Sequence, residues 1–193
     1  MGKIFIITGK SATGKDTIFK QLLEELKLTT IVSYTTRPIR NGEVSGVEYH
    51  FIDDQELEKL KKEGKIIEQR SYHTVCGLWH YLTVNDGQFD DQSKDYAIVG
   101  TLEQYSQIRD YFGKDRVIPI YIEVDGADRL IRSVLREKQQ EEPKYAEICR
   151  RFLADEADFS EENIEKLGIK KRYYNNDLTT CVQEIVGDIK RIL

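Results

Sequence analysis

Cysteine is scarce in this sequence, and the three that occur, Cys76, Cys149 and Cys181, are odd in number and far apart. This usage argues against a disulfide framework and predicts reduced thiols, as in the cytoplasm. Long hydrophobic runs are lacking too: the longest, 4–7 and 117–122, are strand-sized, well short of the roughly 20 residues of a membrane helix. The first residues also lack the basic and apolar stretches of an export signal. We therefore expect a cytoplasmic protein with no membrane partner.

Positive charge is not in excess either. Lysine and arginine number 29 against 34 aspartates and glutamates, which gives a net charge of -5 at pH 7. Proteins that hold long nucleic acid rely on basic patches to displace counterions, so we expect no such partner. A small anionic substrate still fits, because a few clustered arginines suffice to bind it. The 193 residues are enough for one well-packed domain, and they leave monomer or dimer open.

Hydrophobic periodicity indicates alternating strands and helices. The pattern predicts strands at 3–8, 30–35, 48–52, 65–72, 96–99, 116–124 and 170–175, and helices at 15–26, 54–63, 103–112, 127–138, 145–159 and 178–193. Residues 74–95 are rich in aromatics, glycine, aspartate and asparagine, and we expect strands and turns there. This alternation is typical of an α/β fold with a parallel sheet covered on both faces.

A glycine-rich segment, here named the glycine loop, follows the first strand and reads Gly9-Lys10-Ser11-Ala12-Thr13-Gly14-Lys15. It matches the first seven positions of G-x-x-x-x-G-K-S/T and stands, as that pattern requires, between a strand and a helix. Its backbone N–H groups and the helix N-terminus would point at phosphate oxygens, with Lys15 between the terminal phosphates. We predict that residues 9–17 bind ATP. The alternative is a tight strand-to-helix turn with a surface lysine.

One position departs from this pattern, because Asp16 stands where a serine or threonine hydroxyl usually meets the magnesium ion. Oxygen ligands suit Mg²⁺, so we expect either the carboxylate of Asp16 or the hydroxyl of the adjacent Thr17 to lie at the metal. A carboxylate here also repels phosphate. The loop therefore predicts ATP and Mg²⁺ as cofactors but leaves the metal arrangement open between these two side chains.

A second motif lies at 33–51 and reads S-Y-T-T-R-P-I-R-N-G-E-V-S-G-V-E-Y-H-F. Its arginines Arg37 and Arg40 and the phenol of Tyr49 suit an anion clamp, since guanidinium forks match phosphate oxygens. A solvated basic loop is the alternative. Taken together, the two motifs resemble the guanylate kinase family, whose members carry a similar T-T-R-x-x-R-x-G-E-x-x-G-x-x-Y-x-F run at this distance after the P-loop.

The resemblance continues more loosely through Glu68, the segment 136–159 and the ending Y-Y-N-N-D-L at 173–178. It implies a P-loop NTPase fold: a three-layer core with a parallel sheet, formed by 1–32, 96–137 and 160–193. It further implies a monophosphate-binding insertion at 33–95, here named the insertion. The remaining part is a helical lid at 138–159, here named the lid segment. All three parts would belong to one domain.

Matched residue by residue, the resemblance implies roles for side chains in each part. Arg37, Arg40 and Tyr49 would hold the phosphate of the acceptor, with Tyr81 as a second phosphate-binding tyrosine. Ser33 and Glu68 would meet the guanine base, with Glu68 accepting from its N1–H and amine. Lys15, Arg37, Arg40 and the lid arginines Arg136 and Arg151 would stabilise the transferring phosphoryl group. Arg150 and Arg132 compete with those two for the lid roles.

The match breaks after the strand at 96–99. Family members usually have two aspartates there, one near the magnesium and one reading guanine, whereas this chain has Gly100 and Leu102, followed by Glu103. The base-reading evidence is therefore weaker than the evidence for the glycine loop.

We predict ATP-dependent phosphoryl transfer to a purine nucleoside monophosphate, with GMP first among the acceptors. Two alternatives stay open: a guanylate kinase-like module that binds nucleotide or protein without efficient turnover, and a P-loop kinase for another phosphate acceptor.

Overall fold

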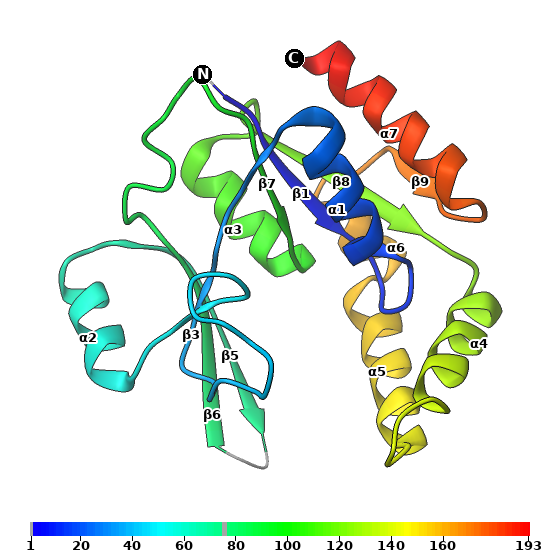
Figure 1. Cartoon of the computed structure of the whole chain (residues 1–193). Helices are drawn as coiled ribbons and strands as arrows, with labels where there is room; N and C mark the ends of the chain where they lie inside the picture. Colours follow the sequence, from blue (N-terminus) through cyan, green and yellow to red (C-terminus); the bar gives the residue numbers. More distant parts are fainter. Residues whose placement is uncertain (1, 75–76) are drawn as a thin grey trace.

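The computed structural model describes residues 2–74 and 77–193. A five-stranded sheet in the order β2-β7-β1-β8-β9, with every recorded pairing parallel, forms its core. A second sheet, in the order β4-β3-β6-β5, lies beside it (Figure 1). The elements run β1 (Ile4–Thr8), α1 (Lys15–Leu26), β2 (Thr29–Thr30), β3 (Tyr34–Thr35), β4 (His50–Phe51), α2 (Asp54–Lys62), β5 (Ile66–Thr74), β6 (Gly77–Val84), β7 (Tyr96–Val99), α3 (Leu102–Phe112), β8 (Val117–Glu123), α4 (Gly126–Glu137), α5 (Tyr145–Asp158), α6 (Glu161–Lys166), β9 (Arg172–Tyr174) and α7 (Leu178–Ile192).

The central strand β1 is buried along its whole length and divides the core into two layers. Because successive strand side chains point to opposite faces, Ile4 and Ile6 pack with apolar residues of α3 and α6. Phe5 and Ile7 pack on the other face with residues of α1 and α7. The predicted three-layer α/β core is therefore confirmed. It also directs the carboxyl ends of β1 and β7 to one edge, where the glycine loop begins.

The insertion has a small core of its own. Leu57 and Leu60 of α2 pack against Leu82 and Val84 of β6, while β5 and β6 form a long antiparallel hairpin. In Figure 1 the insertion and the α4–α5 pair stand on opposite sides below the central sheet. The two groups of elements are thus placed to face each other across the glycine loop.

Two sequence expectations need correction. The predicted strand at 30–35 is two short strands, β2 in the core sheet and β3 in the second sheet. The chain leaves one sheet and joins the other within this β-branched run, and periodicity cannot reveal such a change of partner. No element was predicted from the sequence at 161–166, where the structure has α6. Ser160 caps this helix by accepting a hydrogen bond from Asn163 N.

Among the described residues no helix is long and apolar enough to cross a membrane. Cys149 is exposed and Cys181 is buried, both as free thiols. Cys76 lies outside the described residues.

Candidate active site

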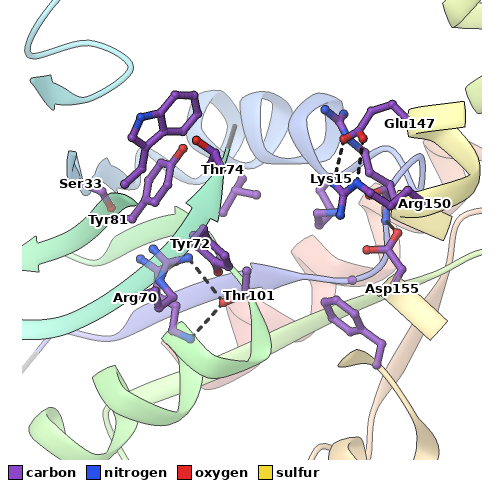
Figure 2. Close-up of a pocket in the computed structure, with 18 of the residues that line it drawn as sticks. Lys15, Ser33, Arg70, Tyr72, Thr74, Tyr81, Thr101, Glu147, Arg150 and Asp155 are labelled. Atoms are coloured by element: carbon purple, nitrogen blue, oxygen red, sulfur yellow. Dashed lines mark hydrogen bonds and ion pairs between the residues drawn. The ribbon is translucent and has the colours of Figure 1, made fainter. Parts of the chain in front are cut away.

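A cleft of about 1170 Å³ lies between the insertion, the glycine loop and α5. Figure 2 shows Ser33 and Tyr81 at one end of it and Lys15, Glu147, Arg150 and Asp155 at the other. Seven of the residues predicted to bind the two nucleotides line this space: Gly9, Ser11, Lys15, Ser33, Arg40, Tyr49 and Tyr81. The remaining residues of the glycine loop, together with Asp16 and Thr17, are not part of the lining, and neither are Arg37 and Glu68, which are described below.

The glycine loop has the backbone conformation that its glycines allow. Gly9 and Gly14 have φ of 148° and 86°, in the region that side chains rarely adopt. A Cβ on Gly9 would lie 2.3 Å from Ile122 O, and one on Gly14 would lie 2.5 Å from Asn175 Nδ2. That Asn175 amide donates to Thr13 O at 2.8 Å. The loop is thus held in shape from outside, by β8 and by the segment after β9.

Lys15 lies half-buried at the start of α1, and its Nζ donates to Lys10 O at 2.7 Å. Burial lowers the pKa of this ammonium to about 8, although the nearby carboxylates of Asp16 and Asp155 act in the opposite direction. A phosphate beside Lys15 would supply the counter-charge that burial withholds. The lysine is therefore suited to bind an anion in the cleft.

Asp16 and Thr17 are exposed in the first turn of α1. Both offer oxygen, the donor that Mg²⁺ prefers, so the residues present fit the ion. In the described residues no cluster of three or more His, Cys, Asp or Glu side chains could hold a metal.

Two carboxylates of α5 dock on the glycine loop. Asp155 Oδ2 accepts from the backbone Ser11 N at 2.7 Å, and Glu156 accepts from Lys10 Nζ at 2.7 Å. Asp155 thus holds a loop N–H group of the kind that a phosphate oxygen would take. Neither residue was predicted from the sequence, because their contact with the loop depends on how α5 packs.

Arg129 of α4 fixes these two carboxylates. Its guanidinium is almost fully buried, pairs with both Asp155 and Glu156, and lies 4.8 Å from the centre of the Phe152 ring. Arg129 was not among the residues predicted from the sequence. Its spacing from Arg132 and Arg136 was an available signal, because residues three and seven apart share a helix face.

The lid arginines occupy different places. Arg150 and Arg151 both line the cleft and both donate to Glu147, at 2.7 and 2.8 Å. These bonds, the one from Arg150 first, lower the pKa of Glu147 to about 2. Arg136 instead lines a smaller neighbouring cavity of about 120 Å³, which it shares with Arg151. Arg132 donates to Asn175 O at 3.0 Å.

At the acceptor end, Arg40, Tyr49 and Tyr81 line the cleft, and the two tyrosine rings lie 5.7 Å apart between centroids. Arg37 does not line it. Its guanidinium is 3% exposed and makes a bidentate pair with Glu43, at 2.9 and 3.0 Å. Hydrogen bonding to Glu43 raises the pKa of Arg37 and in turn lowers that of Glu43. The predicted clamp is therefore only partly open to the cleft in this conformation.

Glu68, which was predicted to bind the base, is also already paired with other side chains of the protein. Its side chain is 0% exposed and accepts from Arg70 Nε at 3.0 Å, from Arg70 NH2 at 3.3 Å and from Thr83 Oγ1 at 2.8 Å. The group that reaches the cleft from this pair is the guanidinium of Arg70, next to Tyr72 and Thr101 (Figure 2). Since β-strand residues two apart share a face, the E-Q-R sequence at 68–70 was a signal for this pairing.

Gln104 completes this wall, where the family's aspartates are missing. Its Nε2 donates to Thr83 Oγ1 at 3.2 Å, and its Oε1 lies 2.5 Å from where a Cβ on Gly100 would stand. Leu102 is buried in the core. Glu103 is not part of the cleft lining, and its carboxylate accepts a hydrogen bond from Gln107. Gly100 therefore gives the space that the Gln104 amide occupies.

Comparisons with known proteins agree on one family. The family model described as guanylate kinase matches residues 1–162. A guanylate kinase of Thermus thermophilus is 42% identical over 71 residues, 37% of this chain and 32% of that protein. One from Neisseria gonorrhoeae is 46% identical over 80 residues, 41% of this chain and 38% of that protein. These matched segments span about a third of the relatives' length.

A solved guanylate kinase structure from Anaplasma phagocytophilum shares the fold over 98% of this chain and 85% of that one. Its TM-score is 0.64 and its sequence identity is 23%.

Proposed function

The chain belongs to the guanylate kinase family, and from that premise we propose that it transfers the terminal phosphoryl group of ATP to a purine nucleoside monophosphate, with GMP as the expected acceptor. One observation carries the proposal. A single cleft has the glycine loop and Lys15 on one wall and Arg40, Tyr49 and Tyr81 on the other. Such a cleft suits two phosphorylated ligands that meet end to end.

In the proposed reaction, an oxygen of the acceptor's phosphate attacks the γ-phosphorus of ATP. A new P–O bond forms, the bond between the γ-phosphorus and the bridging oxygen breaks, and ADP leaves with that oxygen. No enzyme nucleophile is needed, so the protein's part is to position both ligands and to stabilise the charge on the transferring group. Loop N–H groups and Lys15 would hold the donor, while Arg40 and the two tyrosines would hold the acceptor.

The lid segment would complete the site. Arg150 and Arg151 of α5 line the cleft, and Arg136 of α4 lies beside the cleft. Small movements of α4 and α5 would therefore bring these cations to the phosphoryl group. An added arginine at such a position contributes on the order of 10³-fold or more in rate. Bound Mg²⁺, near Asp16 or Thr17, would neutralise the phosphate oxygens. The division into core, insertion and lid segment belongs to this proposal, as does the release of Arg37 from Glu43 to meet the acceptor.

The test is a coupled assay of ADP release with purified protein, ATP and Mg²⁺. GMP, dGMP, IMP, AMP and pyrimidine monophosphates serve as acceptors. We expect release that depends on a purine monophosphate, and a loss of roughly 10²-fold or more in Lys15→Ala, because that lysine faces the developing charge. Absence of acceptor-dependent ADP release would refute the proposal.

A second candidate is a binding module without efficient turnover. It is favoured by two internal ion pairs, Glu68 with Arg70 and Arg37 with Glu43. Glu68 and Arg37, which the resemblance to the family assigns to acceptor binding, are already occupied by these pairs. This candidate predicts nucleotide binding by calorimetry together with no ADP release above the background of Lys15→Ala.

A further inference from the structure

The wall of the cleft that would meet the acceptor's base presents an arginine instead of a carboxylate. Glu68 has no exposed side-chain surface and is bonded to Arg70 and Thr83, while Arg70 lines the cleft. The Glu68–Arg70 pair is neutral as a whole. What it offers to a ligand is therefore a set of N–H donors without a net charge, which suits a neutral oxygen or ring nitrogen better than a second phosphate.

The remaining donors of Arg70 can be assigned from the structure. A guanidinium has five N–H groups in one plane. Nε and one hydrogen of NH2 are directed at Glu68, at 3.0 and 3.3 Å. NH1 makes a long contact of 3.5 Å with Thr101 Oγ1. Arg70 is also hydrogen-bonded with the phenol of Tyr72. Arg70, Tyr72 and Gln104 all line the cleft, so a ligand there would compete only with the Thr101 and Tyr72 contacts for the donors that Glu68 does not take.

Aromatic side chains border the same part of the cleft. Tyr72, Trp79 and Tyr81 all line it, and the rings of Tyr72 and Tyr81 lie 5.7 Å apart between centroids in an edge-on arrangement. Flat apolar surfaces next to a donor edge favour a flat heterocycle that carries acceptors on its rim.

We propose that Arg70, and not Glu68, is the side chain that selects the acceptor's base, by donating to the 6-oxo oxygen and N7 of a purine. Guanidinium groups pair in this bidentate manner with a 6-oxopurine, and the 6-amino group of adenine opposes them with its own donors. The 2-amino group of guanine plays no part in this contact. The acceptor class is thus the 6-oxopurine monophosphates, with hypoxanthine and guanine accepted alike. This inference rests on the proposed function and deepens it.

The direct test is calorimetric binding of GMP, IMP and AMP to the whole chain, with kcat/KM for each in the ADP-release assay. We expect dissociation constants for GMP and IMP within about 3-fold of each other. AMP should bind about 10- to 100-fold more weakly, which is the discrimination typical of one bidentate contact. Preference for GMP over IMP by 30-fold or more would overturn the inference but leave the proposed function intact, because it would mean that a carboxylate reads the 2-amino group.

Variants distinguish base selection by Arg70 from base selection by Glu68. Arg70→Met should reduce the preference for IMP over AMP to about 3-fold or less, whereas Glu68→Gln should keep it, since the glutamine oxygen still accepts from Arg70. Arg70→Met leaves the buried Glu68 carboxylate unpaired, and this variant is therefore open to misfolding. The double variant Glu68→Gln with Arg70→Met removes both charges, and it should lose the preference for IMP over AMP to the same extent. Arg109→Met, on the far end of α3 where the side chain donates to Leu167 O, is the control for loss of an arginine.

ATP affinity is the second readout. It should stay within about 2-fold of wild type in all four variants, because a role confined to the base pocket does not touch the glycine loop. If Glu68→Gln loses the preference and Arg70→Met keeps it, the assignment to Arg70 is wrong. If no monophosphate binds to the wild-type chain, both this inference and the proposed function fail.

Discussion

Replacing Asp155 by alanine should tighten the binding of ATP. In the structure the Asp155 carboxylate accepts from Ser11 N at 2.7 Å and lies 3.4 Å from a nitrogen of Arg129. An incoming phosphate needs the same N–H group and is repelled by the same negative charge. ATP would therefore bind only after the carboxylate has left, and the free energy of that departure would lower the affinity for ATP.

The size of the effect follows from this contact. A hydrogen bond to a charged group contributes about 1.5–3 kcal/mol net. The Asp155 side chain is 16% exposed, so solvent weakens the contact only modestly. Part of this gain in ATP affinity is lost, because Arg129 without Asp155 pairs more firmly with Glu156, and the Glu156 carboxylate stays at the glycine loop through Lys10. We expect the dissociation constant of ATP to fall about 10-fold, which corresponds to about 1.4 kcal/mol.

Calorimetric titration with ATP and Mg²⁺, without any acceptor, measures this change. Asp158→Ala is the matched control: it removes the same charge from the same helix, at an exposed position. It should leave ATP affinity within about 2-fold of wild type. Asp155→Asn should fall between Asp155→Ala and wild type, because its amide oxygen still accepts from Ser11 N without the charge. Unchanged or weaker ATP binding in Asp155→Ala would refute the reasoning that this carboxylate competes with phosphate.

Three further outcomes are expected. At pH 8, ATP binding should take up about half a proton, because Lys15 has a pKa of about 8 in the free protein and this pKa rises beside phosphate. Calorimetry in two buffers of different ionisation enthalpy measures the proton uptake, and Lys15→Arg should abolish the uptake. Asn175→Ala should destabilise the fold by about 1–2 kcal/mol through an unmet buried carbonyl and weaken ATP binding. Thermal melting checks this against the exposed Asn176→Ala, and equal melting temperatures would contradict it. Gly100→Ala should displace the Gln104 amide and weaken acceptor binding several-fold with ATP affinity unchanged; equal loss for both ligands would argue instead for general misfolding.

The sequence revealed the features that depend on local order along the chain. The glycine loop was predicted from the spacing of Gly9, Gly14 and Lys15 because its geometry is fixed by a strand, two permissive residues and a helix start. The core strands followed in the same way from continuous apolar runs. Whether each predicted site residue acts on a ligand stays a prediction.

Features that depend on tertiary packing were not accessible. The docking of Asp155 on Ser11 requires α5 to lie against a loop 144 residues away in the sequence, and no local pattern encodes that distance. The pairing of Arg37 with Glu43 depends on how the loop after β3 folds back. Two local signals could have been read: the opposite charges of Glu68 and Arg70, two residues apart on a strand, and the helical spacing of Arg129 from Arg132 and Arg136.

The hydrogen bond from Asn175 to Thr13 has a consequence for how the chain matures. Its two ends are 162 residues apart, so the support of the glycine loop cannot form until β9 has joined β8. Contacts of such long range are gained late, after the entropy of closing the intervening chain has been overcome. A growing polypeptide would thus carry its glycine loop in an unbraced form until the segment that contains Asn175 has been made and has folded against it.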